Sequence, residues 1–149
     1  MLEFDLLAGE VPTRTAVVAR PNFPTGFRQA LLDNDVTADD VDLVGGLRAR
    51  VVALNGEDFS EYERIEVRAC PIGSPGGCND IAFIMFSQSD LFLRRDQTVN
   101  LNPSLVNFRD LFLGNDNVRI EVTFRSGTVT SRNIPARLEW AINAVGDLD

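Results

Sequence analysis

Residues 41–54, with the sequence VDLVGGLRARVVAL, place apolar or small side chains mostly at alternate positions. A period of two indicates a β-strand with one face buried. Residues 64–70, RIEVRAC, alternate in the same way, and residues 118–125 form a further strand candidate. The pair Gly45-Gly46 predicts a β-bulge or a close packing point inside the first strand. These segments predict an antiparallel β-protein.

The rest of the chain supplies further short elements. Additional strand candidates are residues 2–7, 15–19, 81–86, 98–101 and 137–146, of which the continuous apolar run 81–86 is typical of a strand buried on both faces. Residues 27–32 suggest one helical turn, and residues 104–113 predict a short helix. Seven or eight strands with one short helix predict a single all-β domain spanning residues 1–149, an antiparallel immunoglobulin-like β-sandwich.

The chain contains neither histidine nor lysine, so 14 arginines supply all of its positively charged side chains. The usual general base, the Schiff-base amine and the P-loop amine are therefore missing, and we expect no enzymatic activity and no organic cofactor. The net charge of −8 argues against nucleic acid or an anionic membrane as partner. No apolar run approaches the ~20 residues of a transmembrane helix, and the start does not resemble an export signal.

The two cysteines, Cys70 and Cys78, flank a segment that contains two prolines and three glycines. This composition predicts a tight reversal that brings the two sulfur atoms within reach of each other. Two cysteines without histidine do not complete a closed zinc site, and their spacing is longer than that of a CxxC redox pair. We expect a structural disulfide, which would indicate an oxidising compartment, and two free thiols are the alternative.

The order of these features resembles that of a known family. The segments that carry the resemblance are residues 4–6, 39–44, 47–51, 59–67, 99–101, 108–112 and 137–142. In pattern and order they are similar to the immunoglobulin-like β-sandwich of small secreted bacterial lipoproteins, which resembles late-embryogenesis-abundant (LEA) type sandwiches. The resemblance implies an exported, membrane-tethered domain without catalytic residues. The chain departs from the family in having no lipobox cysteine at its start.

Residues 33–42 carry five carboxylates and no cation. Asp33, Asp35 and Asp39 have spacings found in EF-hand loops, so they are candidate calcium ligands. The glycine and the bidentate glutamate of that motif are absent. The alternative is an acidic turn in which the aspartates cap backbone N–H groups and Thr37 forms a capping box with Asp40.

The ten phenylalanines divide into two groups. Those in predicted elements are expected in the core together with the single tryptophan: Phe83, Phe86, Phe108, Phe112, Phe124 and Trp140. Phe23, Phe27 and Phe92 lie in loop-like sequence and are candidates for a binding surface that receives an apolar ligand or a protein.

These observations predict a non-catalytic binding or structural module of the bacterial envelope. It would act outside the cytoplasm, after removal of an export signal, and recognise a protein or envelope component through loops and strand edges. A lipid anchor outside this chain is compatible with this function. Two alternatives stay open: a calcium-stabilised adhesion-type domain, and a carrier of an apolar ligand between the sheets.

Overall fold

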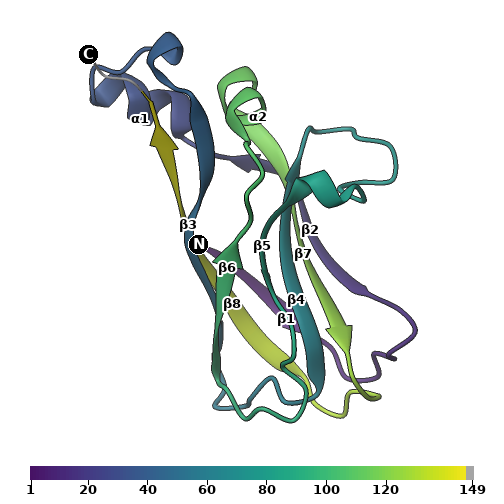
Figure 1. Cartoon of the computed structure of the whole chain (residues 1–149). Coiled ribbons are helices and arrows are strands. Elements are labelled where there is room, and N and C mark those ends of the chain that lie inside the picture. Colours follow the sequence, from purple (N-terminus) through teal and green to yellow (C-terminus); the bar gives the residue numbers. More distant parts are fainter. Residues whose placement is uncertain (147–149) are drawn as a thin grey trace.

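The computed structural model describes residues 1–146, in which eight antiparallel strands and two short α-helices form the regular structure (Figure 1). The strands are β1 (Leu2–Leu6), β2 (Ala16–Pro24), β3 (Leu43–Ala53), β4 (Tyr62–Cys70), β5 (Ile84–Gln88), β6 (Thr98–Pro103), β7 (Asn117–Ser126) and β8 (Ile134–Val145). The helical elements are α1 (Phe27–Asp33), α2 (Arg109–Gly114) and the 3-10 turns η1 (Ala38–Asp40) and η2 (Ile81–Phe83). The all-β, antiparallel prediction is confirmed.

The strands form one nearly closed sheet in the order β1-β8-β3-β6-β5-β4-β7-β2. Only two residue pairs join β5 to β6. The sheet therefore divides into a β3 group (β1, β8, β3 and β6) and a β4 group (β5, β4, β7 and β2). At the two ends of the order, Arg20 of β2 donates a hydrogen bond to the backbone oxygen of Glu3 in β1 at 2.7 Å. This side chain bridges the gap that remains between β1 and β2.

The connectivity differs from the immunoglobulin-like order expected from the sequence. In an immunoglobulin domain the first two strands, A and B, are neighbours in one sheet. Here β1 pairs with β8 and β2 pairs with β7, so consecutive strands lie in different groups. The period of a strand fixes which face is buried, but it carries no information about the neighbour that the strand selects. For this reason the strands were predictable and their order was not.

The core lies between the two groups of strands. The predicted period-two segments supply alternate side chains to it. Among the largest fully buried side chains of the protein are Tyr62, Phe59, Phe86, Phe112, Phe124, Ile65 and Met85. Phe108 is also buried, as expected, whereas Phe83 and Trp140 are half-buried. The Phe124 ring in β7 lies 5.5 Å from that of Phe4 in β1, which joins the two groups, and 5.6 Å from that of Tyr62 in β4, within its own group.

Two elements begin later than the sequence predicts, because a polar side chain caps the backbone at the residue where each one begins. The apolar run 81–86 is not one buried strand: the Asp80 carboxylate accepts a hydrogen bond from the backbone N–H of Ala82 at 2.9 Å, and η2 precedes β5. The helix predicted over 104–113 begins only at Arg109, whose N–H donates to the Asn107 side chain at 3.0 Å. The helical turn near Phe27 is confirmed as α1. Among residues 1–146, no helix has the length and apolar character needed to cross a bilayer.

The Gly45-Gly46 pair is a site of close packing, as predicted. The β3–β8 register shifts between Gly46 and Arg48, which marks a bulge. A Cβ atom on Gly46 would lie 2.6 Å from the ring of Phe86, which is fully buried. The core therefore leaves no room for a side chain at Gly46.

We expect Gly46→Ala to lower the free energy of unfolding by about 1–2 kcal/mol, because the Phe86 ring would have to move within a packed core. Gly45→Ala is the matched control, since its Cβ would meet only Leu43 at an ordinary 3.6 Å. Urea unfolding followed by circular dichroism measures both. Equal losses in the two variants would contradict the packing explanation.

Candidate functional site

Four loops gather at one end of the molecule. Because all neighbouring strands are antiparallel, the connections that follow β1, β3, β5 and β7 lie at the same end, the lower end in Figure 1. We call residues 7–15, 54–61, 89–97 and 127–133 the loop end. The helices and the disulfide loop lie at the opposite, upper end. A rigid β-sheet scaffold with clustered loops is an arrangement that often carries binding residues.

Backbone hydrogen bonds join these loops to one another. Residues 54–61 are central, since they contact both the 89–97 loop and the 127–133 loop. The bonds run from Phe59 N to Asp96 O at 3.0 Å, Leu93 N to Ser60 O at 2.8 Å, Gly127 N to Glu61 O at 2.9 Å, Gly9 N to Thr130 O at 2.7 Å and Thr130 N to Glu10 O at 2.9 Å. Loops held in this way present a preorganised surface.

Arg132 is the central cation of the loop end. Its guanidinium donates to Glu57 at 2.7 Å and to Asp58 at 3.2 Å, and it lies 3.5 Å from a carboxylate oxygen of Glu61. Burial disfavours the charged guanidinium, but hydrogen bonds to Asp58 and Glu57 outweigh it and raise the pKa of Arg132. Hydrogen bonds from Ser60, followed by the hydrogen bond and the charge of Arg132, lower the pKa of Asp58. One arginine thus fixes the 54–61 loop against the 127–133 loop.

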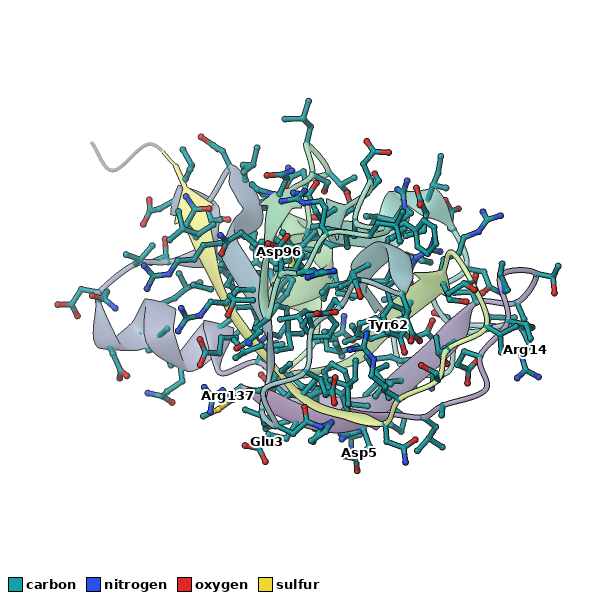
Figure 2. The ribbon with its side chains drawn as sticks, turned by 90° about the horizontal axis from the view of Figure 1, so that it is seen from below. Glu3, Asp5, Arg14, Tyr62, Asp96 and Arg137 are labelled. Atoms are coloured by element: carbon teal, nitrogen blue, oxygen red, sulfur yellow. A yellow bond between two sulfur atoms is a disulfide. The ribbon has the colours of Figure 1, made fainter. Side chains whose placement is uncertain are left out.

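A buried polar group lies above this cluster. Tyr62 is 1% exposed and faces Ser126 across the β4–β7 pair. Within residues 1–146, the hydroxyl groups of both residues and one carboxylate oxygen of Glu10 have no hydrogen-bond partner. Figure 2, a view of the loop end from below, shows Tyr62 well inside the molecule and Arg14 at its outer margin. Burial, together with the negative charges of Glu10 and Glu61, raises the pKa of Tyr62 to about 12.

Each of the four loops exposes one aliphatic side chain. These are Leu7, Leu54, Leu93 and Val129, with exposed fractions between 44% and 74%. Leu93 and the nearby Asp90 have positive φ angles of 69° and 57°, which are unfavourable for residues other than glycine. The loop that presents Leu93 is therefore held in a strained conformation by its contacts with the neighbouring loops.

The disulfide predicted between Cys70 and Cys78 is confirmed, with a Cα–Cα distance of 5.4 Å. It folds residues 71–77 back over the outer face of the β4 group. There the buried Glu121 carboxylate accepts hydrogen bonds from Arg119 at 2.7 Å and from the backbone N–H of Cys78 at 3.2 Å. Arg68 donates to the Cys78 carbonyl at 2.9 Å. The disulfide loop is therefore anchored by charged groups as well as by its covalent bond.

The acidic turn adopts the capping arrangement. The capping box between Thr37 and Asp40 is confirmed, and hydrogen bonds from Thr37 lower the pKa of Asp40. Asp33 instead accepts a hydrogen bond from Gln29 within α1 at 2.9 Å, and Asp35 and Asp39 are exposed. In the part of the chain that the structure describes, no group of three or more carboxylates or thiols is arranged to hold a metal ion. The turn as it stands therefore presents no calcium ligand set.

The three phenylalanines proposed as one binding surface lie apart. Phe27 is buried in the core, where its ring is 5.8 Å from that of Phe112. Phe23 is half-buried against Trp140, with ring centroids 5.7 Å apart. Phe92 belongs to the loop end, but its ring covers Gly127. Phe27 is therefore not an exposed residue, although its side chain lines a groove beside α1. The exposed aliphatic residues of the four loops were missed because no local pattern marks them.

Comparison with known proteins adds no family. No protein-family model matches the chain, and no curated protein matches its sequence.

Proposed function

We propose that this protein is a non-catalytic binding module of the bacterial envelope that recognises a protein or envelope component through its loop end. The observation that carries the proposal is the convergence of four hydrogen-bonded loops that each expose one aliphatic side chain. Apolar side chains on a rigid, polar-rimmed surface are typical of interaction sites. The strand order supports a jelly-roll sandwich, an architecture found in lectin and capsid domains.

The disulfide supports a location outside the cytoplasm, because such bonds persist in oxidising compartments. We infer that an export signal is removed before the domain acts, and that a lipid anchor outside this chain would hold it at the envelope. The resemblance to small secreted lipoproteins agrees with this location, although the connectivity differs from the immunoglobulin order.

Binding through the loop end predicts a localised loss on substitution. We expect the double variant Leu93→Ser/Val129→Ser to reduce the fraction of protein that co-sediments with envelope fragments of the source cells by about tenfold, because apolar residues at an interface centre carry most of the binding energy. The matched control is Ile81→Ser/Leu105→Ser, which alters two exposed aliphatic residues at the upper end. Circular dichroism verifies that both variants fold. An equal loss in both, or none in either, would remove the loop end as the binding surface.

The second candidate is a carrier of an apolar ligand, and one groove favours it. The space between the strand groups is filled by core side chains, so the ligand would lie instead beside α1. There a groove of about 390 Å³ is lined by apolar residues that include Phe27, Leu31, Val36 and Ile142. A lipid in the mass spectrum of the purified protein, lost in Leu31→Arg, would favour this function over the first.

A further inference from the structure

We propose that the outer face of the β3 group binds an acidic saccharide, through Arg48, Arg50, Asn100 and Glu139. These side chains surround a surface depression of about 530 Å³ across β6, β3 and β8. The site lies on the strands and not on the loop end. Its failure would therefore leave the proposed function untouched.

The depression arises from the order of side chains on this face. Arg50 faces Asn100 on one neighbouring strand and Glu139 on the other, so that three polar side chains form one row. In the next row Arg48 faces Ala141, whose methyl group is too short to fill the space. The residues that alternate with them point inward: Ala49, Val51 and Leu138 are buried in the core, and Trp140 is half-buried against it. The site therefore stands on two paired strands whose inner sides are packed.

On this face Arg50 and Arg137 form ion pairs, whereas Arg48 is available to bind a ligand. Glu139 pairs with Arg50 and also with Arg137, which is 2.9 Å away. Within the described residues, no carboxylate lies at ion-pair distance from the exposed Arg48. Arg137 also faces Glu3 across the β1–β8 pair, so Arg48 is the arginine of this face that has no carboxylate partner among the described residues. An arginine guanidinium binds a carboxylate with two parallel hydrogen bonds.

The remaining groups favour a saccharide over an acidic peptide. The Asn100 amide and the Glu139 carboxylate offer donors and acceptors for hydroxyl groups. A peptide that adds a strand needs a free sheet edge, but β3 is paired on both sides, with β6 and β8. Trp140 also lines the depression, and its indole packs against Phe23 on the other side. A ligand rich in hydroxyl groups that also carries carboxylates fits this open, polar site.

The test compares Arg48→Gln with Arg125→Gln by isothermal titration with a short oligogalacturonate. Arg125 is the matched control, since it is also exposed, lies on a strand, has no carboxylate partner among residues 1–146 and faces outward from the opposite group. We expect the unmodified protein to bind, Arg48→Gln to bind at least about tenfold more weakly, and Arg125→Gln to bind as the parent. The fully methyl-esterified oligosaccharide should not bind, because it lacks the carboxylates.

An NMR titration and a titration with poly-L-glutamate test where the ligand binds and to which class it belongs. In the NMR spectrum, the side-chain amide signals of Asn100 should shift on titration of the parent and of Arg125→Gln. Absence of binding to oligogalacturonate, or an equal loss in both variants, would overturn the site. Binding of poly-L-glutamate as tightly as the saccharide would replace the acidic saccharide with an acidic peptide and so overturn the ligand class.

Discussion

Replacing Arg132 with methionine is expected to lower the free energy of unfolding by about 2–4 kcal/mol, because three carboxylates would lose their shared cation. The Arg132 side chain is 31% exposed, so solvent screens part of its attraction to the carboxylates. The lost ion pairs alone therefore account for the lower end of this range. Methionine retains much of the aliphatic stem, so the loss reports the guanidinium. Urea unfolding at neutral pH measures it.

The matched control is Arg94→Met at the same end of the molecule. Arg94 forms a single, more exposed ion pair with Asp96, and such pairs contribute about 0–1 kcal/mol.

The dependence of the unfolding free energy on acid pH is a second test of the Arg132 cluster. The pKa of Asp58 is lowered in the folded protein, so its stabilisation is complete above the unfolded value of 3.8 and is lost as the pH falls through the folded value. The difference between the parent and Arg132→Met should therefore narrow below about pH 4. A constant difference would indicate lost packing and not lost charge.

The sequence predicted the elements of this fold better than their arrangement. Period-two segments such as 64–70 became strands with the expected buried face, and the bulge at Gly46 and the disulfide Cys70–Cys78 were both found. These features depend on residues that are close in the sequence. The strand order depends on which strands pair across the whole chain, and that choice leaves no local pattern.

The residues of the candidate site were even harder to predict from the sequence than the strand order. Arg132 and its partners Glu57 and Asp58 are more than 70 residues apart in the chain, and each occurs in an ordinary polar turn. Their meeting follows from the antiparallel order, which brings the loops after β3 and β7 to the same end. The phenylalanines were singled out by residue type, but Phe27 is in the core, and the exposed aliphatic residues of the loops were not predicted.

Tyr62 permits an unusually clear measurement, because few other groups titrate in the same range. It is the only tyrosine, the chain has no lysine, and both cysteines are bonded to each other. Its ring packs against Phe124 and Phe59, and its buried hydroxyl lies near the negative charges of Glu10 and Glu61. Ionisation would therefore place a charge in a buried position beside two carboxylates, an effect that Thr130 and Arg132 offset only in part.

We expect the stability of the protein to fall by about 2 kcal/mol as the pH rises from 10 to about 12. The folded pKa is raised above the unfolded value of 10.0, so the stabilisation is fully present below pH 10 and is lost as the pH approaches the folded pKa. Tyr62→Phe keeps the ring and removes the hydroxyl, so its stability should stay level over this range. Phenolate absorbance should titrate near 12 in the folded protein and near 10 in denaturant. An equal alkaline loss in Tyr62→Phe would show that another group is responsible.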